Sequence, residues 1–208
     1  MPFPILGGKA IVDTGYNIAN SCRFNEPDAP YMTRGSISES NRETWTFSYW
    51  IKRANLTVPS ATPGNQTQWS QGTGDGVSDT IAQFWRTDEA STAGLEIWGT
   101  ASDSFTFKFQ TKMIFEDISA WYHIVIACDT TQSTEANRFK IYINGTLLVA
   151  ADFITANYPA EDLETTVNTT GDMLIGKKYN NKYHDGYLAE FAFIDGTQYA
   201  ASDFGEFD

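Results

Sequence analysis

Paired carboxyl groups would be the clearest sign of an enzyme in this sequence, because retaining hydrolysis of a glycoside needs two of them about 5 Å apart. Glu96 and Glu190 each stand alone in a strand-like segment. Asp88-Glu89 and Glu116-Asp117 are adjacent pairs, whose side chains would point to opposite faces of a strand. The sequence therefore predicts no hydrolase and no catalytic residue.

The two histidines add no catalytic motif. His123 lies within WYHIVIA, where Trp121 and Val125 share its face of a strand, so we expect a packed and hydrogen-bonded ring. His184 lies in the turn-like sequence YHDG, where it can be exposed. Because no serine or cysteine occupies a recognisable nucleophile elbow, acyl transfer has no support.

Calcium binding is the one metal chemistry that the sequence leaves open. Hard oxygen ligands could come from Gly74-Asp75-Gly76 with Asp79, or from Asp185 beside the last strand. Neither group matches a spaced ligand code, and Asp-Gly is first of all a turn dipeptide. We therefore assign no metal ligand and expect no cofactor, with calcium kept as the alternative.

A surplus of aromatic side chains is the feature that points to sugar binding. The chain has 14 Phe, 10 Tyr and 6 Trp, and ring faces stack on sugars while nearby amides and carboxylates bind the hydroxyl groups. Core filling is the alternative: we expect Trp45, Trp50 and Trp121 in the core, and for Trp85 and Trp98 the two roles are evenly balanced. The predicted ligand-binding residues are Trp69, Trp85, Trp98, Tyr179, Asn180, Asn181, Tyr183, His184 and Asp185.

Strands must carry most of the core side chains, because apolar residues recur with a period of two, while Trp69 and residues 179–185 are expected in loops and Trp85 and Trp98 at strand ends. Phe139, Ile141 and Ile143 share one face, and Asn144-Gly145 predicts a two-residue type I′ turn that returns residues 146–150 beside them. Cys22 to Phe24 and Tyr31-Met32 are expected to form a first pair of short strands around the turn at residues 26–28. Further strands are predicted at residues 44–53, 81–86, 95–98, 104–110, where Phe105, Phe107 and Phe109 share a face, and 121–128, and from 173.

Long polar segments separate these strands. Residues 54–80, which contain Trp69, and residues 158–171 are predicted to be loops. Residues 1–20, broken by Pro2, Pro4 and several glycines, are predicted to form a separate arm before a single domain at 21–208. About ten strands with no helical crossover indicate an all-β fold, a two-sheet antiparallel sandwich.

Composition limits the possible partners. The net charge of −12 should repel nucleic acid and anionic membranes. No run of ~18 apolar residues and no basic leader occurs, so we expect a soluble chain made in a cytoplasm. Cys22 and Cys128 lie in apolar strand-like contexts and are expected to be buried free thiols.

Several phrases, in order along residues 21–204, carry a family resemblance: TWTFSYWIKR, WYHIVIACD, KIYINGTLL, LIGK and DGYLAEFAFIDG. Together they resemble the concanavalin A-like, laminin-G-like jelly roll found in many glycan-binding and glycan-cleaving proteins. The E-x-D-x-x-E pattern of glycosidases on that fold is absent. TWTFSYWIKR, NRFKIYING, DGYLAEFAFIDG and SDFGE also resemble sandwich domains of tailed-bacteriophage virion proteins.

This resemblance implies a non-enzymatic structural protein on the virion exterior, made in the host cytoplasm. It would serve in a tail fibre, an adhesin or a capsid decoration, and contact host-surface glycans. Residues 1–20 would bind copies of the chain, as a homo-oligomer, or other virion proteins, because their apolar side chains exceed what a solvated tail exposes. The alternative is that they fold back over an open sheet edge of their own domain. A free-standing lectin is the first alternative, and a glycosidase is the second.

Overall fold

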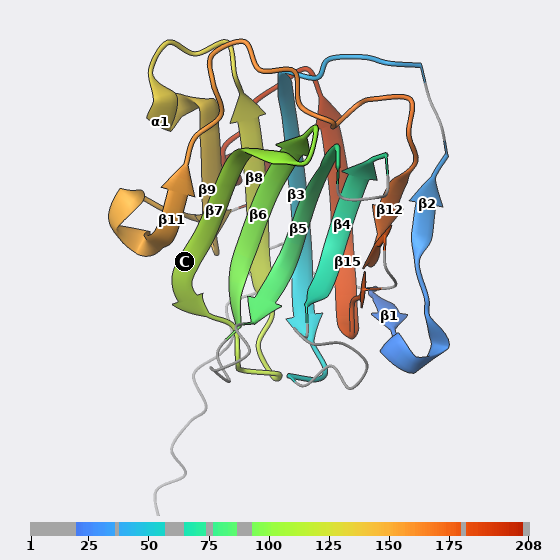
Figure 1. The fold of residues 1–208 in the computed structure, drawn as a ribbon. Coiled ribbons are helices and arrows are strands. Elements are labelled where there is room, and N and C mark those ends of the chain that lie inside the picture. Colours follow the sequence, from blue (N-terminus) through green and yellow to red (C-terminus); the bar gives the residue numbers. More distant parts are fainter. Residues whose placement is uncertain are drawn as a thin grey trace, which may run out of the picture.

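Two antiparallel β-sheets packed face to face form this protein, as the computed structural model shows (Figure 1). The structure describes residues 20–35, 38–56, 65–73, 77–86, 93–179 and 182–205. The predicted two-sheet jelly-roll sandwich is confirmed. Most of the predicted arm, residues 1–19, lies outside the described residues.

One sheet has six strands. In spatial order they are β1 (Cys22–Phe24), β15 (Gly186–Asp195), β3 (Thr44–Arg53), β8 (Tyr122–Asp129), β9 (Phe139–Ile143) and β10 (Thr146–Leu147). The predicted hairpin joins the last two, with Asn144 at φ 47° and Gly145 at φ 81°, which are the left-handed values that a type I′ turn needs. The backbone N–H of His123 donates to Asn144 Oδ1 at 2.8 Å and thereby fixes the turn to β8.

The other sheet has seven strands. Their spatial order is β11 (Phe153–Asn157), β7 (Ser104–Ile114), β6 (Ala93–Ala101), β5 (Asp79–Arg86), β4 (Gln66–Gly72), β12 (Met173–Ile175) and β2 (Met32–Arg34). A short ladder of β13 (Lys177–Lys178) and β14 (Lys182–Tyr183) lies beside β4. Helical structure among the described residues is short and includes α1 (Glu135–Arg138) and 3-10 turns at Glu26–Asp28, Ala150–Asp152 and Ala201–Phe204.

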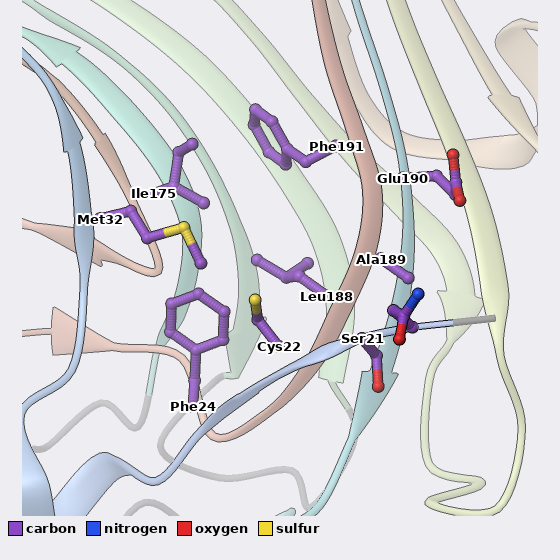
Figure 2. A pocket seen from close by; sticks show the side chains of 10 residues that line it. Ser21, Cys22, Phe24, Met32, Ile175, Leu188, Ala189, Glu190 and Phe191 are labelled. Atoms are coloured by element: carbon purple, nitrogen blue, oxygen red, sulfur yellow. The ribbon is translucent and has the colours of Figure 1, made fainter. Parts of the chain in front are cut away.

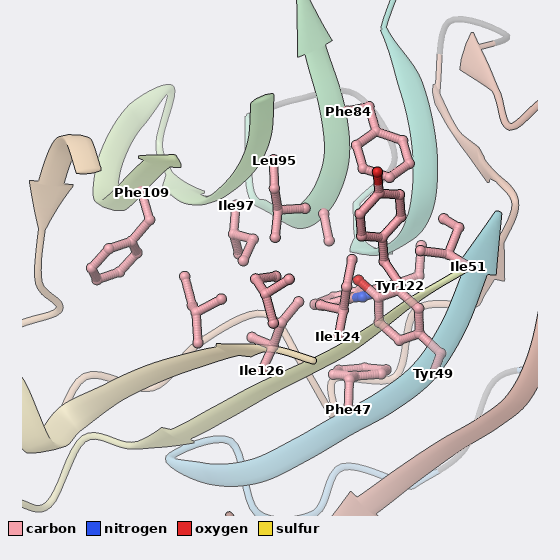
Figure 3. Close-up of a cluster of buried hydrophobic side chains, with 14 of the residues drawn as sticks. Phe47, Tyr49, Ile51, Phe84, Leu95, Ile97, Phe109, Tyr122, Ile124 and Ile126 are labelled. Atoms are coloured by element: carbon pink, nitrogen blue, oxygen red, sulfur yellow. The ribbon is translucent and has the colours of Figure 1, made fainter. Parts of the chain in front are cut away.

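Aromatic and branched side chains fill the space between the sheets (Figure 3). Alternation along β3 sends Trp45, Phe47, Tyr49 and Ile51 inward, where all four are fully buried. In Figure 3 the side chains of β3 and β8 meet Phe84, Leu95, Ile97 and Phe109 from the seven-stranded sheet. No helix in the described part of the chain is long and apolar enough to cross a bilayer.

Strand pairing differs from the prediction at the N-terminal end. β1 pairs with β15 and β2 pairs with β12, so the turn at Glu26–Asp28 links the two sheets rather than closing a hairpin. The predicted loop at residues 54–80 contains β4, which pairs with β5. Its Gln and Ser residues have little intrinsic strand preference, and burial between neighbouring strands outweighs that preference.

Three residues expected in the core lie elsewhere. Trp50 and Trp121 are half-buried on the outer face of the six-stranded sheet, where Trp50 packs on His123 at 4.9 Å between ring centroids. Trp50 follows Tyr49 directly, and alternation therefore turns it away from the core. Cys128 is a buried free thiol as predicted, but the free thiol of Cys22 is exposed because β1 is an edge strand.

Candidate functional site

A row of polar side chains crosses the outer face of the seven-stranded sheet. Gln83, Glu96 and Gln110 lie opposite one another on β5, β6 and β7. Their sequence neighbours Phe84, Ile97 and Phe109 face the core, and the period of two therefore turns the polar residues outward. Gln83 Nε2 donates to Glu96 Oε2 at 2.5 Å, and Gln110 Nε2 donates to Glu96 Oε1 at 3.0 Å.

Two further residues extend this row at its ends. Thr155 Oγ1 on β11 donates to Gln110 Oε1 at 2.8 Å. Lys178 Nζ on β13 donates to Gln83 Oε1 at 2.9 Å. The resulting hydrogen-bonded chain, here called the polar ladder, consists of Lys178, Gln83, Glu96, Gln110 and Thr155. It gives every amide in the row a defined orientation, and because its glutamines, Glu96 and Lys178 are almost fully buried, it holds this part of the sheet rigid.

Aromatic rings and lysines alternate beside the polar ladder. Lys108 Nζ forms an ion pair with Glu96 at 3.0 Å and lies 4.7 Å from the ring centroid of Phe105. Phe105 meets Trp98 edge to face at 5.8 Å. Lys178 Nζ lies 5.6 Å from the Trp98 ring and 5.5 Å from the Tyr179 ring. We call this continuous set the lysine–aromatic cluster; its members are Lys108, Phe105, Trp98, Lys178 and Tyr179.

The ammonium group of Lys178 experiences opposing effects. Burial lowers its pKa from 10.5 to about 8, while the negative charges of Glu96 and Asp79 favour its protonated form. At neutral pH the group is therefore still charged, and only 7% of the residue is exposed. A buried ammonium held between acceptors and ring faces is a fixed hydrogen-bond donor.

A β-bulge brings Phe105 to this face. The sequence predicts that Phe105, Phe107 and Phe109 share one face, but the register of β6 and β7 shifts between Gly99 and Thr100. Phe107 and Phe109 remain buried, whereas Phe105 lies opposite Thr100 and is 60% exposed. The extra residue inverts the alternation at the end of the strand, as bulges do.

Comparison with known proteins identifies the fold family. A family model described as the concanavalin A-like lectin/glucanases superfamily, Laminin_G_3, matches residues 28–201. The chain belongs to this superfamily. No curated protein sequence matches it.

Two solved structures share the concanavalin A-like fold. Domain 4 of AbnA, a GH43 extracellular arabinanase from Geobacillus stearothermophilus in complex with arabinotriose, has a TM-score of 0.54 at 12% identity, over 86% of this chain and 72% of that chain. Mouse laminin α1 domains LG4-5 have a TM-score of 0.56 at 10% identity, over 94% of this chain and 48% of that chain. The chain therefore spans about half of the laminin fragment.

The predicted ligand-binding residues separate in this concanavalin A-like domain. Trp98 and Tyr179 belong to the lysine–aromatic cluster. Trp85 is half-buried on β5 and, two residues from Gln83, shares its outward face. Asn180 and Asn181 lie outside the described residues.

Trp69 is wrongly predicted as a loop residue that contacts sugar. It lies in β4, is fully buried, and stacks on Phe47 with 3.9 Å between ring centroids and 14° between ring planes. Trp45 meets it edge to face at 6.2 Å. The bulge between Thr67 and Trp69 sets this inward direction, because it aligns Trp69 with core residue Ala82.

His184 and Asp185 are also buried, although they were predicted to bind ligand and the turn-like sequence left His184 open to exposure. His184 has no exposed surface and packs near Phe24, with 5.9 Å between ring centroids. Asp185 forms an ion pair with Arg23, with 3.3 Å between Asp185 Oδ1 and Arg23 Nη2. Tyr183 is 9% exposed, and its ring centroid lies 5.4 Å from Lys177 Nζ. β1 covers this start of β15, and the turn is therefore part of the packed sandwich.

Sequence reasoning missed several members of the candidate site. Gln83, Lys108, Gln110 and Lys178 were not selected, and Glu96 was considered only as a lone catalytic carboxylate. A usable signal exists in AQFW and FKFQ, where polar residues alternate with core aromatics and must face outward. His123 is packed as predicted, 1% exposed, with its Nε2 2.9 Å from Ser48 Oγ.

Metal ligands do not gather within the part of the chain that the structure describes. No three of its His, Cys, Asp or Glu side chains are placed to hold one ion. Of the calcium candidates, residues 74–76 lie outside the described residues, Asp79 is 2% exposed, and Asp185 pairs with Arg23.

Proposed function

We propose that this chain is a non-enzymatic glycan-binding domain, and that it binds sugar through the lysine–aromatic cluster. The observation that carries the proposal is the continuous contact of Lys108, Phe105, Trp98, Lys178 and Tyr179 beside the polar ladder. A ring face with fixed donors and acceptors around it matches a pyranose, which has an apolar face and a rim of hydroxyl groups. The arabinanase domain of the same fold supports this, since it was solved with a trisaccharide.

Phe105 would be the main contact for the sugar ring. It is the most exposed member of the cluster at 60%, and Lys108 beside it keeps 22% of its side chain exposed. Lys108 could donate to a sugar hydroxyl while its ion pair with Glu96 holds it in position. Trp98 is only 7% exposed, so it packs edge to face against Phe105 and does not offer its own ring face to a sugar.

Catalysis is not part of this proposal. Both oxygens of Glu96 already accept hydrogen bonds from amides, and one also accepts from Lys108. Glu190 lies on β15 in the other sheet. Facing sheets lie about 10 Å apart, whereas a retaining mechanism needs carboxyl groups about 5 Å apart. This separation supports a domain that binds glycans and does not cleave them.

A place on the exterior of a tailed-phage virion, in a fibre, adhesin or capsid decoration, is the finer part of the proposal. It rests on the resemblance in TWTFSYWIKR and DGYLAEFAFIDG, which form β3 and β15. Many copies on one particle would raise a weak single-site affinity for host-surface glycans. Residues 1–20 would join the domain to other copies or to other virion proteins. The alternative is a free-standing lectin with the same binding face.

A glycan array on the purified chain tests the binding proposal. Phe105→Ala should weaken binding about fivefold, which corresponds to about 1 kcal/mol for one stacked ring. Ile154→Ala is the matched control, because Ile154 is 63% exposed on β11 of the same sheet. Binding that survives Phe105→Ala and Tyr179→Ala unchanged would place the sugar elsewhere.

Two further measurements test the remaining parts of the proposal. Incubation with laminarin, agarose and similar polysaccharides should release no sugar; turnover abolished by Glu96→Gln would contradict a purely binding role. A cryo-EM map of the source particle should contain this sandwich on its outer surface, and its absence there would favour the free-standing lectin.

A further inference from the structure

An apolar cleft opens between the two sheets at one side of the sandwich (Figure 2). It has a volume of about 260 Å³ and is lined mainly by Phe24, Met32, Ile175, Leu188 and Phe191. In Figure 2 these side chains and the Cys22 sulfur surround a common space. A cavity of about 150 Å³ already accepts a benzene-sized group, and this cleft therefore has room for more than one aliphatic side chain.

The cleft exists because both sheets end here in short strands. β1 and β2, three residues each, are the outermost strands of the six- and seven-stranded sheets at this side. Glu190 has φ 48° within the register shift of β15, and this bulge follows the last residues that pair with β1. Edge strands of this kind present backbone groups that can pair with an added chain segment. Among the residues that the structure describes, no further strand pairs with β1 or β2 at these edges, so the cleft offers an apolar floor beside two strand edges.

The sequence before β1 matches this surface. Asn20 and Ser21 line the cleft, so residues 1–19 join the domain at its mouth. Residues 1–12 carry Phe3, Ile5, Leu6, Ile11 and Val12, which are apolar side chains of the size that the cleft accepts. Lys9 carries the only cationic side chain among those twelve residues, and Glu190 is an exposed anion that lines the cleft.

We propose that the cleft binds residues 1–12 of a second copy of this chain. β1 runs antiparallel to β15 with Cys22 opposite Leu188, so the backbone at Ser21 and Asn20 leads past Ala189 and Glu190, and the same chain would have to turn back to place Leu6 in the cleft. A segment from a neighbouring copy enters without that reversal. Each copy gives one segment and accepts one, and the contact builds either a reciprocal dimer or a head-to-tail ring or fibre. This inference does not depend on glycan binding.

Disulfide trapping with the native Cys22 tests the proposal directly. Cys22 is exposed and lines the cleft, while Cys128 is buried and its thiol pKa is raised well above normal by burial, so it stays unreactive. Leu6→Cys and Ile11→Cys are introduced separately into the full chain and oxidised mildly. We expect a covalent dimer, or longer species, on a non-reducing gel. Adding Cys22→Ser should remove it.

Ser133→Cys supplies the control for random collision, because Ser133 is an exposed position outside the cleft lining. Cross-linking no stronger than in this control would overturn the proposal. A cross-linked monomer would also overturn it, since that product shows the chain's own segment in the cleft. Sedimentation of two variants is a second measurement. One variant lacks residues 1–12, and the other carries Met32→Lys at a position that is 42% exposed. Each should self-associate at least tenfold more weakly than the wild-type chain and keep its melting temperature. Self-association that is unchanged in both variants would contradict the proposal.

Discussion

Acidification from pH 7.5 to pH 5.0 should lower the free energy of unfolding by about 4 kcal/mol, because two histidines are buried as neutral rings. Burial, with an added contribution from the charge of Arg53, lowers the pKa of His184 to about 3. Burial lowers the pKa of His123 to about 4. An unfolded histidine ionises near pH 6.5.

The sign follows from which state takes up protons. Below pH 6.5 the unfolded chain binds a proton at each histidine, while the folded chain binds none until the pH falls to about 4. The stabilisation is therefore complete above pH 6.5 and is lost as the pH falls toward the folded pKa values. At pH 5.0, each histidine contributes a loss of about 2 kcal/mol, at about 1.4 kcal/mol per pH unit.

Urea unfolding followed by tryptophan fluorescence at several pH values between 7.5 and 5.0 measures this loss. Ordinary carboxyl groups titrate near pH 4, below the chosen window. His184→Gln and His123→Gln should each remove about half of the pH dependence, whatever their effect on stability at pH 7.5. A free energy of unfolding that stays flat from pH 7.5 to 5.0 in the wild-type chain would refute the reasoning.

Three other perturbations have defined outcomes. Raising the pH from 7 to 9 should add about 1 kcal/mol to the free energy of unfolding. The buried ammonium of Lys178, with a pKa of about 8, loses its proton in this range, while the lysine of the unfolded chain keeps it. Urea unfolding should show that this gain vanishes in Lys178→Met. Trp69→Ala should cost about 3–5 kcal/mol in urea unfolding, as for a large core side chain, and an unchanged midpoint would contradict its place against Phe47. Asn144→Ala should lower the free energy of unfolding by about 1–2 kcal/mol in thermal unfolding, because alanine resists the left-handed φ of 47°. Asn144→Gly should lower it by less. Equal losses would mean that the hydrogen bond from the His123 backbone to the Asn144 side chain dominates.

The sequence alone determined most of the strands and the hairpin at Asn144-Gly145, although it placed β4 in a loop. Period-two alternation in TWTFSYWIKR and FKIYI is local, and Asn144-Gly145 encodes its own turn through left-handed backbone preference. The absence of a carboxylate pair within one strand was also visible, because neighbouring residues on a strand point to opposite faces. These properties depend only on residues that are close in the chain.

Tertiary structure decided which residues form the candidate site. The bulge before Thr100 turns Phe105 outward, and the bulge at Gln68 turns Trp69 inward; each depends on the register with a neighbouring strand. Pairing of β1 with β15 covers His184, and separation of β1 from β2 opens the cleft that exposes Cys22. Strand register and sheet partners are set by contacts between residues far apart in sequence, and composition and periodicity therefore identified aromatic side chains without showing which of them face solvent.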